Sequence, residues 1–494
     1  MSEGEMGRRN ENSLTHNKKH LTLSHTDTGT HHRCNEHEYF ILKVWFKHIT
    51  LEHITLEHSI GSTSYSGGLT ANNNRPHKTI NMNMQGIYQS TSLLLLAFGS
   101  ADAFSTATNA PSSVADVTQV GSLTVPTIGC GTIAWSTDFG SQKPDPELVD
   151  LVSTASSNQN GVFFDTGERY GSHAKTALGM GWGETECLVA KLLNENDAAQ
   201  KNPTKAVVAT KFTPSPWRTT VESVVEACEE SRRRLGVDSI DLYQIQMPDI
   251  VKPLRRFGFD KSYDKIYWDG LAECYHRGLV KNVGVSNYGP TLVTECSEHL
   301  AKRGVPLASN QIAYSLIGRH NGAQQTLDTC NELGVKVLAY YPFAMGLLTG
   351  KYTSAMPELS AEHALTSSLT KSRRSKFEQK DLERYANGDG KSIPAGGVAP
   401  LLSTMERIAN DRDKTVAQVA LNYIICKGAI PIPGSRTSAQ YDDNMGALGW
   451  RLTEAEVAEM ENVADNLGFS FDGAGFKRSN AKFVGYGMET WSLT

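Results

Sequence analysis

Three residues of this sequence have the types and the order needed for proton transfer. Asp165 and Tyr170 lie in the segment 163–171, and Lys211 ends the apolar, β-branched run 207–211. A tyrosine in water has a pKa of about 10, and a neighbouring ammonium group lowers that pKa. Lys211 is therefore expected to make Tyr170 a better proton donor to a carbonyl oxygen. Asp165 is expected to keep Lys211 charged in a partly dry pocket.

Each of these residues also has an ordinary structural explanation when it is taken alone. Asp165 could cap a helix, Tyr170 could pack in the interior, and Lys211 could end a strand in solvent. The three residue types in this order favour the chemical interpretation over three independent structural roles.

The elements that must position these residues follow an alternating pattern, in which apolar strand-like runs are separated by helix-like segments such as 219–235 and 290–303. This pattern predicts an α/β protein with parallel strands, a (β/α)8 TIM barrel spanning 120–470. The candidate residues would then lie at the carboxyl ends of strands, where barrel active sites are built. The predicted strands are a first one near 128–133, then 161–166, 205–211, 240–245, 280–285, 307–311, 335–340 and 429–432.

Further motifs follow Lys211 along the chain. They are Ile240-Asp241-Leu242-Tyr243-Gln244, Gly284-Val285-Ser286-Asn287, Ser309-Asn310-Gln311, Ala339-Tyr340-Tyr341-Pro342 and Pro431-Ile432-Pro433-Gly434-Ser435-Arg436. Together with Asp-Thr-x-x-x-Tyr-Gly at 165–171, this ordered set resembles the aldo-keto reductase family over about residues 120 to 465. The resemblance implies an enzyme that reduces an aldehyde or ketone to an alcohol with NADPH and without a metal.

The resemblance also assigns residues to the nicotinamide end of the cofactor. It implies that Ser286, Asn287 and Gln311 hold the carboxamide and that Tyr340 stacks on the ring, which leaves one hydride face exposed. Tyr341 stands where many relatives carry a serine beside the ring.

A second group of residues is implied to bind the adenosine 2′-phosphate. Arg436 is the main candidate, because a guanidinium can form two hydrogen bonds with phosphate oxygens. Ser435, Gln440 and Asn444 would assist it, and this set favours NADPH over NADH.

One residue departs from the family pattern. Relatives normally carry a histidine after the Asp-Leu-Tyr-Gln strand, where it positions the carbonyl, and this chain has Gln246 there. A glutamine amide can donate a hydrogen bond, but it does not exchange a proton near pH 7. A slow or substrate-restricted reductase and a nearly inactive protein are both compatible with this change. The alternative function is an NADPH-binding sensor or regulatory protein with little turnover.

Within the family, the chain resembles the plastid pyridoxal reductases of plants. The similar segments include Pro216-Trp217-Arg218, Trp268-Asp269-Gly270-Leu271 and Gly446-Ala447-Leu448-Gly449-Trp450. Several of these belong to the scaffold, so they indicate kinship better than substrate. The resemblance suggests the reduction of pyridoxal to pyridoxine.

The front of the chain differs from the barrel in composition. Residues 1–81 contain ten of the 15 histidines and are predicted to be disordered or to precede the true start of translation at Met82 or Met84. Their cluster of His31, His32 and nearby donors is expected to bind metal only adventitiously. Residues 82–119 combine an apolar run with small residues, which predicts a cleavable signal followed by a plastid presequence. The expected destination is the plastid stroma, with the cytoplasm as the alternative.

Composition sets the remaining limits for this 494-residue chain. A net charge of −5 and the lack of a long basic cluster give no reason to expect nucleic acid as a partner. Eight cysteines without a Cys-x-x-Cys pair predict reduced thiols, and the mature protein is expected to act on a small carbonyl compound away from membranes. A surface insertion is predicted at 352–398 and a C-terminal tail at 471–494.

Overall fold

The computed structural model describes residues 116–135, 145–171, 182–201, 206–249, 262–320, 322–350, 387–388, 390 and 394–469. The predicted extension 1–81, nearly all of the presequence 82–119, most of the insertion 352–398 and the tail 471–494 lie outside the described residues.

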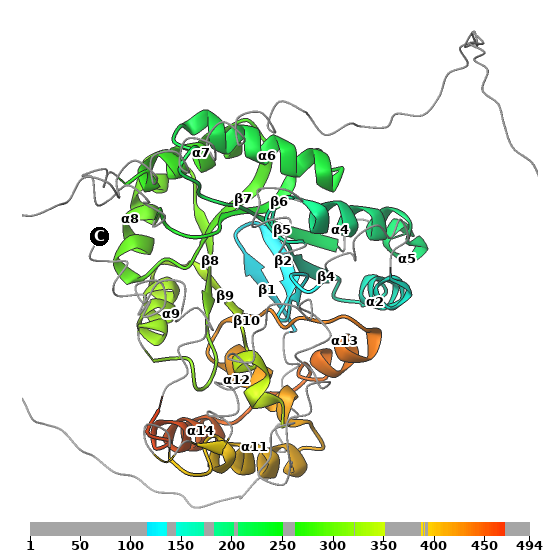
Figure 1. The fold of residues 1–494 in the computed structure, drawn as a ribbon, viewed down its shortest axis with the longest axis vertical. Coiled ribbons are helices and arrows are strands. Elements are labelled where there is room, and N and C mark those ends of the chain that lie inside the picture. Colours follow the sequence, from blue (N-terminus) through cyan, green and yellow to red (C-terminus); the bar gives the residue numbers. More distant parts are fainter. Residues whose placement is uncertain are drawn as a thin grey trace, which may run out of the picture. The chain divides into compact units, whose positions relative to one another are not determined.

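Eight parallel strands form one sheet, in which each strand pairs with its neighbours along the chain. Backbone hydrogen bonds of 2.9 Å run from Gly129 to Pro431 and from Gly131 to Pro433, and they join the first strand to the last. The sheet is therefore closed, and the predicted (β/α)8 barrel is confirmed (Figure 1). Its strands are β3 (Cys130–Gly131), β4 (Val162–Asp165), β5 (Ala206–Phe212), β6 (Ile240–Ile245), β7 (Val280–Ser286), β8 (Leu307–Ala313), β9 (Lys336–Tyr340) and β10 (Ile430–Pro431).

Helices surround the strands, and their ends agree with local sequence signals. α6 begins after a capping box between Thr220 and Ser223 and ends at Gly236, whose φ of 68° suits glycine. α8 begins at Pro290, where the missing N–H of proline costs nothing. The helices are α2 (Pro146–Ser156), α4 (Glu184–Asn194), α5 (Asp197–Lys201), α6 (Val221–Leu235), α7 (Asp264–His276), α8 (Pro290–Ala301), α9 (Ala323–Glu332), α11 (Ala399–Asp411), α12 (Val416–Cys426), α13 (Ser438–Met445) and α14 (Glu454–Asp465), with a 3-10 segment η3 (Ala344–Thr349).

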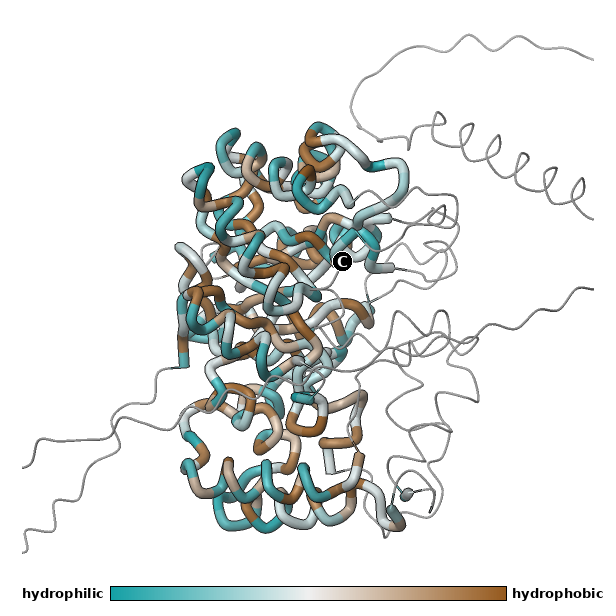
Figure 2. Tube along the Cα trace, turned by 90° about the vertical axis from the view of Figure 1, so that its left-hand side faces the viewer, coloured by the Kyte–Doolittle hydropathy of each residue, from teal (hydrophilic) through white to brown (hydrophobic). Residues whose placement is uncertain are grey.

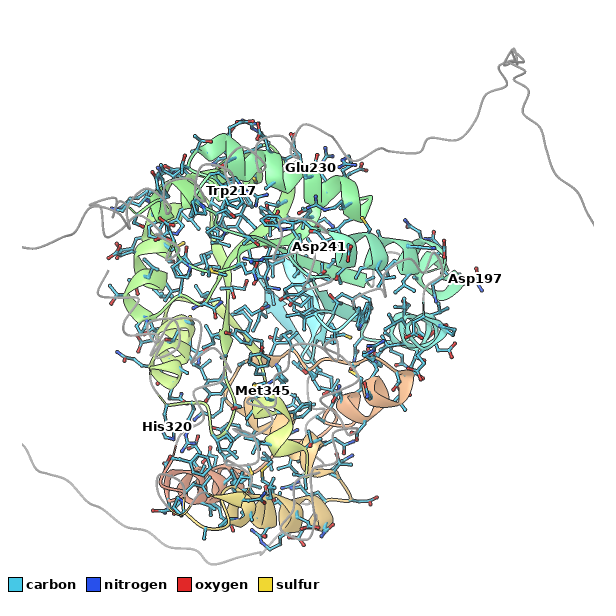
Figure 3. All side chains as sticks on the ribbon, viewed as in Figure 1. Asp197, Trp217, Glu230, Asp241, His320 and Met345 are labelled. Atoms are coloured by element: carbon cyan, nitrogen blue, oxygen red, sulfur yellow. The ribbon has the colours of Figure 1, made fainter. Side chains whose placement is uncertain are left out.

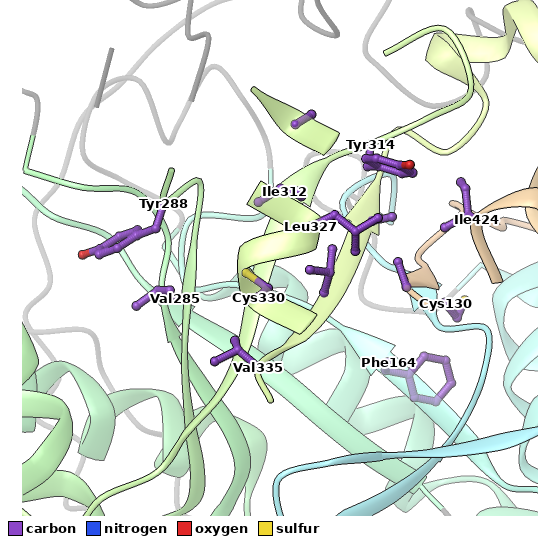
Figure 4. Packing of buried hydrophobic residues seen from close by; sticks show 14 of the residues in the cluster. Cys130, Phe164, Val285, Tyr288, Ile312, Tyr314, Leu327, Cys330, Val335 and Ile424 are labelled. Carbon is purple, nitrogen blue, oxygen red and sulfur yellow. The ribbon is translucent and has the colours of Figure 1, made fainter. Parts of the chain in front are cut away.

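The main hydrophobic core lies between the strands and this ring of helices. Hydrophobic and hydrophilic residues alternate along the outer helices (Figure 2), and apolar side chains of α6, α7 and α9 belong to this core. Phe164, Val285 and Leu327 are fully buried there, and they come from β4, β7 and α9 (Figure 4).

A hairpin that the sequence analysis did not identify packs on the barrel. β1 (Val117–Val120) and β2 (Leu123–Pro126) are antiparallel, and β1 begins three residues before the predicted barrel start at 120. Val120 and Val125 are fully buried in one cluster with Phe163 and Leu242 of the barrel strands. The hairpin therefore closes the barrel at the amino ends of the strands and leaves the carboxyl ends for a site (Figure 1).

Three further observations apply to the described part of the chain alone. Its seven cysteines carry free thiols. None of its helices combines the length and the apolar composition needed to cross a bilayer. It contains no group of three or more His, Cys, Asp or Glu side chains that could hold a metal ion.

Candidate active site

Asp165, Tyr170 and Lys211 meet at the carboxyl ends of two adjacent strands. Asp165 is the last residue of β4, and Lys211 is the penultimate residue of β5. Lys211 Nζ lies 2.7 Å from both carboxylate oxygens of Asp165 and 3.0 Å from the hydroxyl of Tyr170. It also donates to the carbonyl of Thr166 at 2.8 Å. The three residues selected from the sequence therefore form one cluster, in which Asp165 and Lys211 are buried and Tyr170 is half-buried.

The electrostatics of this cluster correct one sequence prediction. Burial raises the pKa of Tyr170 well above 10, and the Asp165 carboxylate raises it further. Burial also lowers the pKa of Lys211, although Asp165 opposes that change. The sequence led us to expect a lowered pKa for Tyr170, and burial and the Asp165 carboxylate raise it instead. Tyr170 therefore keeps its proton at neutral pH.

A second group of polar residues lies at the ends of β7, β8 and β9. Gln311 Nε2 donates to Asp165 at 2.8 Å, and Ser286 Oγ donates to the Gln311 carbonyl at 2.8 Å. Tyr340 donates to Asn287 Oδ1 at 2.7 Å. Asn287 has a φ of 65°, a left-handed conformation that asparagine tolerates better than most residues. The structure thus links the four predicted nicotinamide residues to one another and to Asp165.

Gln246 lies directly after β6, between the two groups. Its backbone N–H donates to Phe212 at 2.8 Å, and its carbonyl accepts a hydrogen bond of 2.9 Å from Asn287 Nδ2. Its side-chain oxygen accepts a hydrogen bond of 2.6 Å from the hydroxyl of Thr213. Gln246 is half-buried, and hydrogen bonds hold its backbone at two points and its side chain at one.

The four predicted phosphate-binding residues lie in and just before α13. Asn444 Nδ2 donates to Ser435 Oγ at 3.0 Å, and the backbone N–H of Arg436 donates to Gln440 Oε1 at 2.8 Å. The Arg436 guanidinium also lies 3.2 Å from the carboxylate of Asp145, the N-cap of α2. A phosphate bound there would compete with Asp145 for the guanidinium.

Sequence analysis assigned no role to an ion pair that supports the site. Glu168, which is 1% exposed, accepts hydrogen bonds of 2.5 Å from Arg218 and from the backbone N–H of Thr213. The Arg218 guanidinium lies over the rings of Trp182 and Phe212. Glu168 lies inside the 165–171 motif. Thr213 lies two residues after Lys211, and side chains two positions apart point to the same face of a strand, so this spacing could have identified Thr213 from the sequence.

Two aromatic residues, Tyr341 and Trp217, are unusual in backbone conformation and in exposure, respectively. Tyr341 has a φ of 54°, a strained value for a bulky residue, and its ring packs edge-on against Tyr340 at 5.0 Å. Trp217, in the loop after β5, is 66% exposed (Figure 3).

Comparisons with known proteins found one matching family model and several relatives. The model of the aldo/keto reductase family matches residues 127–465. The chain is 35% identical to the chloroplastic pyridoxal reductase of Arabidopsis thaliana over 350 residues, which are 70% of this chain and 85% of that protein. It is 25% identical to an NADP(+) aldo-keto reductase of Schizosaccharomyces pombe over 356 residues, 70% of this chain and 91% of that protein.

Among solved structures, the fold resembles a glycerol dehydrogenase from Gluconobacter oxydans. The TM-score is 0.52 at 23% identity, with 71% of this chain and 96% of that chain covered. At this identity the likeness supports the barrel fold alone.

Proposed function

The chain belongs to the aldo/keto reductase family, and from this premise we propose that it reduces an aldehyde to an alcohol with NADPH, with pyridoxal as the foremost substrate. The observation that carries the proposal is the contact of Lys211 Nζ with both Asp165 and Tyr170, at 2.7 and 3.0 Å. A buried ammonium, its counter-ion and a neutral phenol are the parts that proton donation to a carbonyl oxygen requires.

The residues present fit an NADP(H) cofactor. The amides of Asn287 and Gln311 at the strand ends suit a carboxamide, which needs both donors and acceptors. At the start of α13, Arg436 keeps a quarter of its side-chain surface exposed, which suits a phosphate group. A relative supports the choice, since the aldo-keto reductase of Schizosaccharomyces pombe is named for NADP(+).

The chain's own residues would act on the carbonyl in separate ways. When bound, the cofactor supplies the hydride that reduces the carbonyl carbon. Tyr170 donates its proton to the carbonyl oxygen, because it is the neutral phenol whose hydroxyl contacts Lys211 at 3.0 Å. Lys211 stabilises the phenolate that remains, and Asp165 holds Lys211 in place. Gln246 donates an N–H to the same oxygen in place of the usual histidine.

The proposed substrate and location come from the name of one relative and from the sequence of residues 82–119. The Arabidopsis relative is named for pyridoxal and for the chloroplast, and the sequence of residues 82–119 predicts a plastid presequence. We propose on this basis that the mature enzyme works in the plastid stroma.

The test is single-turnover oxidation of bound NADPH by the chain starting after Ala103, mixed first with pyridoxal and then with simple aromatic and aliphatic aldehydes. Fast oxidation with pyridoxal alone supports a vitamin B6 reductase, and fast oxidation with many aldehydes supports a general carbonyl reductase. A protein that oxidises NADPH with none of them contradicts the proposal.

Gln246 favours one alternative, an NADPH sensor with negligible turnover, because the usual histidine is lost. This function predicts tight NADPH binding together with no oxidation by any aldehyde in the same experiment.

A further inference from the structure

Gln246 has one polar contact through its side chain, and that contact determines what the amide can do. Thr213 Oγ1 lies 2.6 Å from the amide oxygen Oε1. An amide oxygen only accepts hydrogen bonds, so the threonine hydroxyl must be the donor. With Oε1 turned toward Thr213, the Nε2 group points away from Thr213. Within the described part of the chain, no residue accepts a hydrogen bond from Gln246 Nε2.

Strand geometry places both side chains inside the catalytic rim. Lys211 pairs in register with Gln244, and Phe212 pairs with Ile245, so Thr213 and Gln246 are the next neighbours across the two strands. Side chains alternate between the two faces of a strand. Thr213 therefore lies on the face of Lys211, and Gln246 lies on the face of Gln244.

The alternate positions confirm this assignment. Phe212 packs against the Tyr267 ring of α7 at 5.3 Å, outside the barrel. Gln244 accepts a hydrogen bond from Ser309 at 3.2 Å, inside the barrel.

Thr213 is itself held firmly. It is fully buried, and its backbone N–H donates to Glu168 Oε1 at 2.5 Å. The same Glu168 oxygen accepts from Arg218, which also donates to the Thr213 carbonyl at 3.3 Å. The buried ion pair of Glu168 and Arg218 thus fixes the backbone of Thr213 from both sides. A hydroxyl on a fixed backbone is a strong constraint on the orientation of the amide that it contacts.

We propose that Thr213 is a positioning residue that keeps the amide of Gln246 in the orientation that presents N–H, not oxygen, to the substrate carbonyl. The inference rests on the proposed reductase function. An amide in the opposite orientation would turn an acceptor toward the carbonyl oxygen, and two acceptors repel each other. This contact explains how a glutamine can take the place of a neutral imidazole donor.

The test compares Thr213→Val with Thr213→Ser. Valine has a similar shape but no hydroxyl, and we expect kcat for an aldehyde to fall about tenfold, the ratio that matches one hydrogen bond of ordinary strength. Thr213→Ser should restore most of this loss, and NADPH affinity should be the same in both variants. Thr294→Val is the matched control, because its hydroxyl bonds the Pro290 carbonyl in α8, away from the site.

A double-mutant cycle separates positioning from a general structural role. In a Gln246→Ala background, Thr213→Val should cause no further loss of kcat, because the amide that it orients is gone. An equal loss in both backgrounds would overturn the proposal, as would full activity of Thr213→Val. If Thr213→Val fails to fold, Thr213→Ala serves in the same cycle.

Failure of the reductase function gives a different result. If the wild-type protein reduces no aldehyde, the same cycle is measured with the affinity for benzaldehyde. Quenching of tryptophan fluorescence reports the binding. The inference is supported if the effects of the Thr213 and Gln246 substitutions on this affinity depend on each other. It is contradicted if the two effects simply add.

Discussion

Gln311 reaches across the barrel from β8 and donates a hydrogen bond of 2.8 Å to Asp165, at the end of β4. This contact joins the predicted nicotinamide residues to the predicted proton-transfer residues, because Asp165 also holds Lys211 at 2.7 Å. Cofactor binding and proton donation should therefore depend on each other through one carboxylate.

Gln311→Leu tests this link. The variant should bind NADPH about tenfold more weakly and should also lower kcat, because Asp165 loses one of its donors and Lys211 is held less firmly. Fluorescence titration gives the affinity for NADPH, and saturating NADPH gives kcat. Gln440→Leu is the comparison, since this residue contacts Arg436 at the other end of the proposed cofactor site. It should weaken NADPH binding with kcat unchanged. A normal kcat in Gln311→Leu would contradict the link.

Tyr170→Phe separates the proton donor from the binding site. The change removes the hydroxyl that lies 3.0 Å from Lys211 and keeps the ring. We expect turnover to fall by at least about a hundredfold, the lower end of general-acid contributions, while NADPH affinity stays within a factor of two. Stopped-flow oxidation of bound NADPH measures the first quantity and titration measures the second. Turnover at the wild-type rate would mean that another group donates the proton.

The sequence predicts the strands of this barrel well for a physical reason. β5 opens with the apolar run 206–209 and β6 carries Ile240, Leu242, Tyr243 and Ile245, as buried parallel strands require, and both strands lie within one residue of their predicted bounds. Strand-end placement then brings Asp165 and Lys211 together, since neighbouring parallel strands end at the same rim.

The sequence does not show how deeply a side chain is buried or which charged residues far apart in the chain form pairs. The pKa of Tyr170 depends on the loss of water around its phenol, which no local pattern records. The ion pair of Glu168 with Arg218 joins residues 50 positions apart, and their contact exists only in the folded chain. The β1–β2 hairpin is missed because most of β1 falls inside 82–119, which the sequence analysis assigned to the presequence.

Gln246→His tests whether the amide is a weaker substitute for imidazole. The variant should be faster than the wild type if the N–H alone is limiting, since histidine is the residue that the family resemblance implies at this position. It should also introduce an inflection near pH 6.5 in kcat/KM, because an imidazole titrates there and an amide does not. Benzaldehyde is the suitable substrate, since it has no ionisation of its own in this range. An unchanged or lower rate would indicate a pocket that has adapted to the amide.

The last prediction concerns stability at the C-terminal helix. Glu456 caps α14 with Thr453 and accepts two hydrogen bonds from Arg412, at 2.8 and 2.6 Å. These bonds lower the pKa of Glu456 from 4.5 to about 2. Its folded-state pKa lies below its unfolded value, so the carboxylate stabilises the fold above pH 4.5, and this contribution is lost as the pH falls from 4.5 toward 2.

Glu456→Gln should therefore be less stable than the wild type at pH 7, with the difference shrinking below pH 4.5. Urea unfolding of both proteins at pH 7, 5 and 3.5 measures the difference. Glu454→Gln, in the same first turn, is the control, and a gap between wild type and Glu456→Gln that is constant with pH would contradict the assignment.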